Sequence, residues 1–338
     1  MTSNDNLVPP PSSRLIATAG GTKIDRERTQ ASVQEMLEYS TFVSAPKDSV
    51  AKTELEKKLA EIHTHGVETY KYLGKILPIY PLQAYLLTWL IGLVDAKNVF
   101  EIGTFTGYST IYLADALRGN GVKAKTGSSN GNVREEENGG LKPVVSCELV
   151  KEVAEHAEAN FVKAGVDDLI EVRQGKALDT IKSLPKGTKF DFIFIDADKH
   201  SYTTYYKAIM DLELLSTKGV LVFDNTMLAR TERLVGKEAN QIYEFNQSII
   251  DRVQGDFQNE LTSAPLKVAA ETSIGGNEIG SGGGKKDLTE DEKDFMVNEV
   301  NQILHAFNVH VKNDDRVQQL SLPILTGMTV IRLVQSKD

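Results

Sequence analysis

Short runs of β-branched and aromatic residues recur along the middle of the chain, and segments with helical spacing separate them. We predict buried strands that end near Ile102, Cys147, Arg173, Ile195 and Phe223. The spacing between them predicts helices at 151–164 and 201–214. Strands that alternate with helices are typical of a parallel sheet with helices on both faces. In the second helix we assign core and rim packing to Tyr202, Tyr205 and Tyr206.

The end of the chain has a different pattern. Two strand-like runs, 317–323 and 328–334, are separated by a connection of hairpin length. We therefore expect an antiparallel pair to complete an otherwise parallel sheet. The fold class predicted from the pattern is α/β, with seven strands.

Polar side chains follow two of the predicted strands. Asp196 follows FDFIFI, and Asp224 and Asn225 follow VLVF, so three oxygen donors should meet at the carboxyl edge of the sheet. Lys199 lies three residues after Asp196. This set suits a divalent hard cation beside a proton acceptor. Two other interpretations stay open: Asp198 could be only a helix cap, and Lys199 could only neutralise Asp196.

The first predicted strand leads into a glycine-bearing turn, NVFEIGTFTGYST, and then into a helix that begins near Tyr108. Its glycines are spaced GxxxG, so the GxGxxG pattern of pyrophosphate binding is absent and a nicotinamide dehydrogenase is disfavoured. Glu148 follows the second strand, where an acidic side chain can accept both hydroxyls of a ribose. A cofactor with adenosine but no phosphate fits this layout, and S-adenosylmethionine is such a cofactor.

These segments resemble a known family, the cation-dependent O-methyltransferases typified by the caffeoyl-CoA and catechol O-methyltransferases. The matching strings are, in order, FEIGTFTGYST, KAGVDDLIEVRQGKAL, FDFIFIDADKHSYTTYY, GVLVFDNT and LSLPILTGMTVIRL. The resemblance spans roughly Thr53 to Val334. It implies a Rossmann-like class I methyltransferase fold, S-adenosylmethionine and a divalent cation as cofactors, and a homodimer.

The resemblance also implies roles for individual residues. It implies a cation held by Asp196, Asp224 and Asn225, and it implies Lys199 as general base, so that Asp196 and Lys199 are the catalytic pair. The cofactor residues that it implies are Glu101, Gly103, Thr104 and Ser109 at the methionine end, Glu148 at the ribose, and Ala177 and Asp198 at the adenine side. The chain departs from the family at 79–84, which reads IYPLQA, and at 227–230, which reads MLAR. The acceptor is therefore not carried across.

Two classes of function follow from these residues. The first is an S-adenosylmethionine-dependent O-methyltransferase that acts on a hydroxyl of a small metal-chelating phenol, of catechol or caffeoyl type. Mg²⁺ is the expected ion, with Mn²⁺ or Ca²⁺ as alternatives. The second is a noncatalytic protein of the same fold that binds the cofactor or a partner. The oxygen donors together with Lys199 argue against the second class, because a binding module needs no assembled metal and base.

The motifs favour one methyltransferase domain over 46–338, after an N-terminal arm at 1–45 that we expect to be partly disordered. Two insertions interrupt this domain. The first, 119–141, is rich in Gly, Asn, Ser and charge and is expected to be a surface loop. The second, 233–286, has helical spacing at 241–253, and we interpret it as either a lid over the acceptor or a surface elaboration.

Composition narrows the possible partners. A formal net charge of −9 disfavours nonspecific binding to nucleic acid and to anionic membranes. The single cysteine, Cys147, precludes an intramolecular disulfide, so a reducing, cytoplasmic location is the simplest expectation. Pro78 and Pro81 interrupt the apolar stretch 76–94, which we interpret as a buried helix and not as a membrane span.

Overall fold

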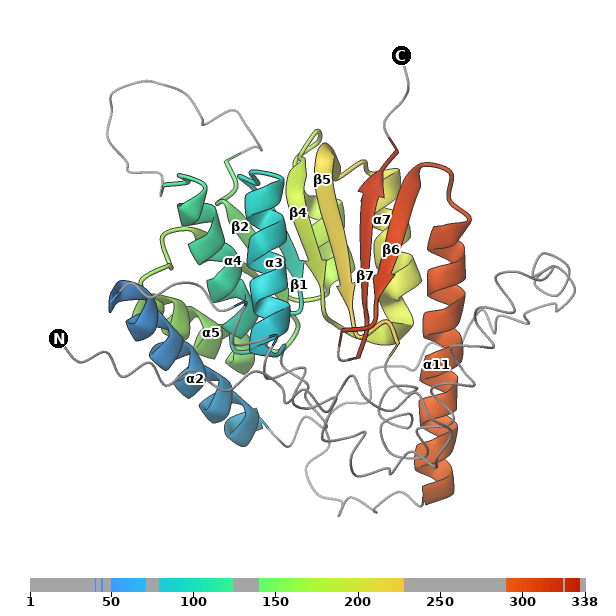
Figure 1. The fold of residues 1–338 in the computed structure, drawn as a ribbon, viewed down its shortest axis with the longest axis horizontal. Helices are drawn as coiled ribbons and strands as arrows, with labels where there is room; N and C mark the ends of the chain where they lie inside the picture. The colour runs from blue at the N-terminus through green and yellow to red at the C-terminus, as the bar shows by residue number, and fades with distance from the viewer. Residues whose placement is uncertain are drawn as a thin grey trace, which may run out of the picture.

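The computed structural model describes residues 40, 44, 50–70, 79–123, 140–227, 290–324 and 326–334. These residues form one seven-stranded sheet in the order β3-β2-β1-β4-β5-β7-β6, with helices on both faces (Figure 1). The second predicted insertion, the core of the first insertion at 124–139 and most of the predicted N-terminal arm lie outside the described residues.

The strands confirm the predicted fold. β1, β2, β3, β4 and β5 pair in parallel, whereas β7 pairs antiparallel with both β5 and β6. Each of the first five strands ends within one residue of its predicted end. The strands are β1 (Val99–Ile102), β2 (Val144–Glu148), β3 (Ile170–Gln174), β4 (Phe190–Ile195), β5 (Leu215–Asp224), β6 (Val317–Leu322) and β7 (Met328–Leu333).

The helices form two layers, one on each face of the sheet. They are α2 (Val50–Tyr70), α3 (Pro81–Leu93), α4 (Tyr108–Gly119), α5 (Lys151–Ala164), α6 (Ala177–Ser183), the short 3₁₀ helix η3 (Lys199–Ser201), α7 (Tyr202–Asp211) and α11 (Glu290–Lys312). Apolar side chains of α3, α4 and α5 share one core with one face of the sheet. Side chains of α6, α7 and α11 fill the core on the other face. Two hydrophobic cores of this kind hold the strand ends in a fixed relation.

Two boundaries differ from the prediction by more than one residue. The second predicted helix, now α7, ends at Asp211 and not at Leu214, because Glu213 takes a left-handed φ of 50° that a helix cannot continue. The strand that follows begins at Leu215, earlier than the apolar run at 220–223 predicts. The pairing of β4 with β5 shifts register at its start, so polar residues enter the strand as an irregularity that periodicity does not reveal.

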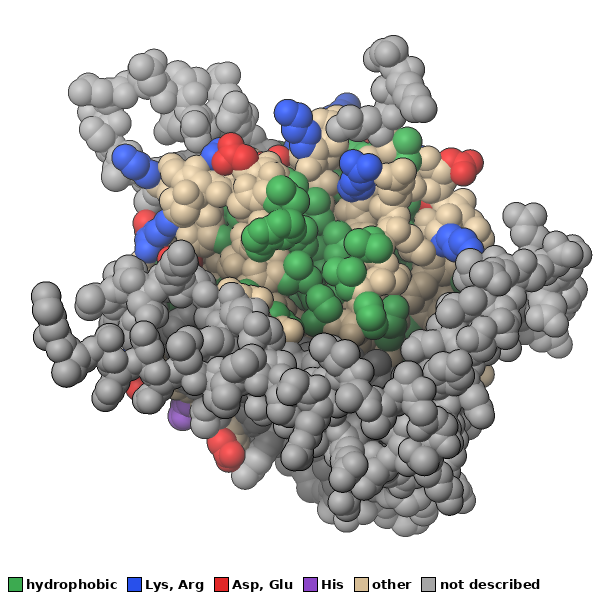
Figure 2. Space-filling model, viewed as in Figure 1, with side chains coloured by type: hydrophobic (Ala, Val, Ile, Leu, Met, Phe, Trp, Pro, Cys, Tyr) green, Lys and Arg blue, Asp and Glu red, His purple; other side chains and the backbone are tan. Residues whose placement is uncertain are grey.

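The predicted buried helix before the first strand is α3, with 13 residues and a fully buried side chain at Leu87. Among the described residues, no helix has the length and apolar character needed to cross a membrane. The outer side of α3 exposes Trp89 and Leu93, and β6 exposes Leu320. Figure 2 shows hydrophobic side chains gathered on this face of the molecule.

The carboxyl ends of the parallel strands meet at the lower edge of the sheet in Figure 1, and α11 runs past this edge. Because every parallel strand delivers its last side chain to the same edge, residues far apart in sequence are brought together there.

Candidate active site

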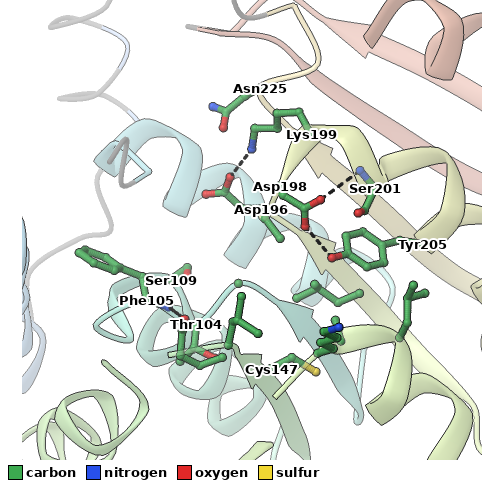
Figure 3. A pocket seen from close by; sticks show the side chains of 18 of the residues that line it. Thr104, Phe105, Ser109, Cys147, Asp196, Asp198, Lys199, Ser201, Tyr205 and Asn225 are labelled. Atoms are coloured by element: carbon green, nitrogen blue, oxygen red, sulfur yellow. Dashed lines mark hydrogen bonds and ion pairs between the residues drawn. The ribbon is translucent and has the colours of Figure 1, made fainter. Parts of the chain in front are cut away.

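A cavity of about 720 Å³ lies at the carboxyl edge of the sheet (Figure 3). Its wall takes residues from the ends of β1, β2, β4 and β5, from α6 and from α11. Nine of the predicted site residues line it: Gly103, Thr104, Ser109, Glu148, Ala177, Asp196, Asp198, Lys199 and Asn225. The other two, Glu101 and Asp224, are fully buried behind the wall.

The carboxylate of Glu101 lies beneath the turn that follows β1. It accepts hydrogen bonds from the hydroxyls of Ser109 at 2.6 Å, Thr110 at 2.6 Å and Ser146 at 2.5 Å. Burial raises the pKa of Glu101 to about 7, although the three hydroxyl donors oppose the rise. Glu101 therefore holds Ser109 in the cavity wall, and its predicted contact with a cofactor would run through that hydroxyl.

Gly103 shows why the turn needs a glycine. Its φ is 104°, and a Cβ atom there would overlap the carbonyl oxygen of Asp196. The ends of β1 and β4 can meet only without a side chain at this position. The predicted cofactor side and the predicted cation side are thus in direct backbone contact.

Glu148 lies at the end of β2, as expected, and its two oxygens are held by backbone amides. The N–H of Phe105 donates to Oε2 and the N–H of Val150 donates to Oε1, both at 2.9 Å. Burial raises the pKa of Glu148, while these amides oppose the rise. Each carboxylate oxygen has a second lone pair, so both can still accept a hydroxyl.

Asp198 lines the cavity and also caps η3, so the capping interpretation holds whether or not Asp198 meets a cofactor. Its carboxylate accepts the backbone N–H of Ser201 at 3.1 Å and the hydroxyl of Tyr205 at 2.7 Å. Nearby, Cys147 lines the same wall, and burial raises the pKa of its thiol to about 12. Cys147 is therefore an uncharged thiol and not a nucleophile at neutral pH.

The ammonium group of Lys199 joins the ends of β4 and β5. Its Nζ donates to Asp196 Oδ1 at 2.9 Å and to the hydroxyl of Tyr202 at 2.7 Å. That hydroxyl in turn donates to the backbone carbonyl of Asp224 at 2.7 Å. Tyr202 is fully buried, as a core residue should be, but it also fixes the position of Lys199. Sequence reasoning assigned it packing, with contact to the acceptor as an alternative, and did not predict that it positions Lys199.

Asp224 is the most unusual group of the site. Its Oδ1 accepts the backbone N–H of Asn225 at 2.7 Å and the side-chain amide of Gln83 at 2.8 Å. Its Oδ2 is buried and has no hydrogen-bond partner among the described residues. Burial, followed by repulsion from Asp196, raises the pKa of Asp224 above its ordinary value. A buried anionic oxygen without a donor is costly, so the chemistry of this atom is suited to contact with a positive charge.

Asn225 completes the predicted set of oxygen donors. Its backbone takes a left-handed φ of 53°, which Asn tolerates better than most residues. Its Nδ2 donates to the hydroxyl of Thr326 at 2.6 Å, so its amide oxygen is left for another partner. The candidate set is two carboxylates and one amide, and no group of three or more His, Cys, Asp or Glu that could hold a metal occurs in the described part of the chain.

The structure thus adds four residues to the predicted site: Gln83, Phe105, Tyr202 and Thr326. Only Tyr202 had a sequence signal, because it follows Lys199 by three residues and so shares a helical face with it. Gln83 lies 141 residues from its partner Asp224, and no local pattern predicts that contact.

The family model for O-methyltransferases matches residues 48–130 and 137–254, which is more than half of the chain. The chain therefore belongs to the O-methyltransferase family. Among curated relatives, it is 32% identical to caffeoyl-CoA O-methyltransferase 1 of Eucalyptus globulus over 203 residues, which cover 59% of this chain and 68% of the relative. It is 30% identical to caffeoyl-CoA O-methyltransferase of Medicago sativa over 204 residues, with the same two shares.

Solved structures show the same fold. The SAH-bound methyltransferase PaMTH1 of Podospora anserina matches with a TM-score of 0.58 and 21% identity, over 94% of this chain and 100% of that chain. The O-methyltransferase of Bacillus cereus in complex with SAH matches with a TM-score of 0.53 and 21% identity, over 89% of this chain and 97% of that chain. The chain has the Rossmann-like methyltransferase fold, and S-adenosylmethionine is the methyl donor of its family.

Proposed function

We propose that this chain is a divalent-cation-dependent O-methyltransferase that methylates a hydroxyl of a small acceptor with two adjacent oxygens. The observation that carries the proposal is that Asp224 Oδ2 has no hydrogen-bond partner among the described residues. Asp224 is buried behind the wall of the cavity that Asp196 and Asn225 line, and it is close enough to Asp196 to be repelled by it. A protein that only bound S-adenosylmethionine would gain nothing from this costly arrangement.

The donor set fits a hard cation. Asp196, Asp224 and Asn225 would hold it, since carboxylate and amide oxygens are the ligands that Mg²⁺ prefers and that Mn²⁺ and Ca²⁺ also accept. When bound, the cation would supply positive charge beside the acceptor oxygens and lower the pKa of a phenol from about 10. Vicinal hydroxyls suit such a site, because two adjacent oxygens can meet one ion.

The residues of the chain would then do three things. The wall from Gly103 to Ser109, together with Glu148, would hold S-adenosylmethionine with its methyl group toward the acceptor. Once its ammonium group has lost a proton to solvent, the uncharged amine of Lys199, held by Tyr202, would take the hydroxyl proton. The acceptor oxygen forms a bond to the methyl carbon as the bond from sulfur to that carbon breaks, which leaves S-adenosylhomocysteine and a methyl ether. Positioning supplies most of the rate, because no covalent enzyme intermediate is needed.

The acceptor class is proposed from the relatives and from the cavity. Two curated relatives are named as caffeoyl-CoA O-methyltransferases. In this chain Ile79 and Val300 add apolar side chains to the wall that holds Lys199 and Asn225. An aromatic ring could pack on these side chains while its oxygens face the polar groups. We therefore propose a phenolic acceptor of catechol or caffeoyl type.

Methyl transfer from S-adenosylmethionine to a panel of catechols and caffeoyl-type esters tests the proposal. It is measured with Mg²⁺ and with a chelator, for the wild type and for Asp224→Ala. Turnover that requires Mg²⁺ and is lost in the variant supports the proposed function. Turnover of equal rate in the chelator contradicts the role of the cation, although it leaves the methyltransferase assignment in place.

The alternative class is a noncatalytic protein of the same fold. Cofactor binding with no methyl transfer to any diphenol of the panel would favour it. Lys199 also keeps a second interpretation, in which it only neutralises Asp196 across their 2.9 Å contact. Loss of the rate in a Lys199 variant that still binds the cation would separate proton transfer from charge balance.

Three expectations stay predictions. A homodimer and a cytoplasmic location are tested by light scattering on the purified protein and by imaging of the tagged chain. The lid interpretation concerns 233–286, which lies outside the described residues. Deletion of 271–286 would raise the Michaelis constant of the acceptor if this segment closes over the site, and an unchanged constant would exclude the lid.

A further inference from the structure

Gln83 is a buried glutamine whose two amide atoms serve different parts of the molecule. It lies in the first turn of α3 and is only 2% exposed. Its Oε1 accepts the backbone N–H of Tyr80 at 2.9 Å, and its Nε2 donates to Asp224 Oδ1 at 2.8 Å. Because a backbone N–H can only donate, Oε1 must face Tyr80, so the NH₂ group must face Asp224. The orientation of the amide is therefore fixed by chemistry.

The contact makes the two oxygens of Asp224 unequal. Oδ1 receives two donors, from Gln83 and from the backbone of Asn225, whereas Oδ2 receives none from the described residues. Two hydrogen-bond donors on one oxygen fix the plane of the carboxylate. Without them, the χ2 torsion of an aspartate has a broad distribution. The oxygen without a donor is then held in one direction.

The start of α3 is also a boundary of the cavity, because Ile79, the residue before Tyr80, lines the wall. Gln83 thus connects a helix terminus at the cavity with a strand end 141 residues away. If Gln83 served only to link the helix to the strand, one hydrogen bond to either oxygen of Asp224 would be enough. Here the bond leaves free the oxygen that the proposed cation would use.

We propose that Gln83 is a positioning residue that orients Asp224 Oδ2 toward a divalent cation. The inference rests on the proposed function, since it assumes that Asp224 is a ligand. Partners that hydrogen-bond to a metal ligand typically change metal affinity by about 10–100-fold when they are removed. Gln83→Met removes both hydrogen bonds and keeps the length and the helix propensity of the side chain.

The test is direct binding of Mn²⁺, followed by electron paramagnetic resonance of the free ion, with the full chain saturated with S-adenosylhomocysteine. We expect the Kd for Mn²⁺ to rise about 10–100-fold in Gln83→Met. The affinity for S-adenosylhomocysteine should stay within about twofold, because Gln83 does not line the cavity. Gln318→Met, at an exposed glutamine of β6, is the matched control and should bind Mn²⁺ as the wild type does.

The outcomes separate the two claims. Mn²⁺ affinity of Gln83→Met within about twofold of wild type, in a variant that still binds S-adenosylhomocysteine, would overturn the role of Gln83 and leave the proposed function intact. A wild type that binds no Mn²⁺ would overturn both. If Gln83→Met does not fold, Gln83→Asn replaces it: its amide is too short to span both partners, so the same loss is expected. Unchanged affinity in that variant would overturn the inference equally.

Discussion

The acidic residues in the two halves of the sheet edge differ in the hydrogen bonds that they receive. At the β1–β2 half, Glu101 and Glu148 receive hydrogen bonds at all four carboxylate oxygens. At the β4–β5 half, Asp224 leaves one buried oxygen with no donor from the described residues. The carboxylates of the β1–β2 half are therefore satisfied by the chain itself, whereas under the proposed function the β4–β5 half receives a positive charge from a bound cation. The comparison indicates that the two halves should respond differently to removal of metal.

The largest expected effect comes from Asp224→Ala. This change removes the oxygen for which the described residues supply no donor, so turnover should fall about 1,000-fold or more, equivalent to several kcal/mol of lost charge stabilisation. Binding of S-adenosylhomocysteine should persist, because the β1–β2 half is untouched. Asp315→Ala, at an exposed aspartate after α11, is the control and should keep full rate. A variant at Asp224 that loses cofactor binding together with turnover would erase the distinction between the halves.

Lys199→Gln should have the next largest effect. It removes the group that would accept the proton but keeps a hydrogen-bonding side chain, so kcat should fall about 100- to 1,000-fold. The measurement is the steady-state rate at saturating acceptor over a range of pH. A rate that recovers as pH rises, when the acceptor ionises without help, supports proton transfer by Lys199. A rate that stays within a few-fold of wild type would reduce Lys199 to the counterion of Asp196.

Glu101→Gln should alter the pH dependence of stability. The pKa of Glu101 is about 7 in the folded protein, above its ordinary value of 4.5. The folded state therefore binds the proton of Glu101 more tightly than the unfolded state does. The wild type consequently loses stability as pH rises from 4.5 to about 7. The variant lacks this loss, and its unfolding free energy relative to wild type should rise by roughly 2–3 kcal/mol between about pH 4.5 and pH 8.

Urea unfolding at several pH values, with exposed Glu158→Gln as control, measures this difference. If the difference in unfolding free energy between Glu101→Gln and wild type does not change with pH, the buried carboxylate of Glu101 causes no loss of stability as pH rises.

Glu148→Gln should have the smallest of these effects, and it should be confined to the cofactor half. Loss of a charge-assisted hydrogen bond to a hydroxyl corresponds to about a 10-fold rise in the Kd for S-adenosylhomocysteine. Calorimetry with and without chelator should give the same change, because β1 separates β2, which carries Glu148, from β4 and β5. Exposed Glu155→Gln on α5 is the control. A chelator-dependent change would show that the two halves are coupled.

Local patterns predicted the parts of the molecule that local forces determine. The helix at Lys151–Ala164 and the strand ends before Asp196 and Asp224 follow from periodicity and from abrupt changes to polar residues. The contact between Gln83 and Asp224 could not be predicted in this way. It depends on how α3 packs across the sheet, and Gln83 reads in sequence as one polar residue at the start of an apolar helix.

The candidate site also contains contacts that local sequence patterns could not predict. Strand ends placed Glu101 at the edge, but only the structure shows that three hydroxyls enclose it behind the cavity wall. Likewise, Tyr202 fits a core position by its spacing, yet its hydroxyl bonds both Lys199 and the end of β5. Burial of a residue and the direction of its polar atom are separate properties, and periodicity reports only the first.

Direct titration of the wild-type protein with Mn²⁺, saturated with S-adenosylhomocysteine, tests the central claim most directly. The account predicts about one bound Mn²⁺ per chain, which Mg²⁺ displaces and a chelator removes without release of the cofactor product. A protein that binds S-adenosylhomocysteine but holds no Mn²⁺ at millimolar concentration would contradict the claim that the β4–β5 half is arranged for a cation.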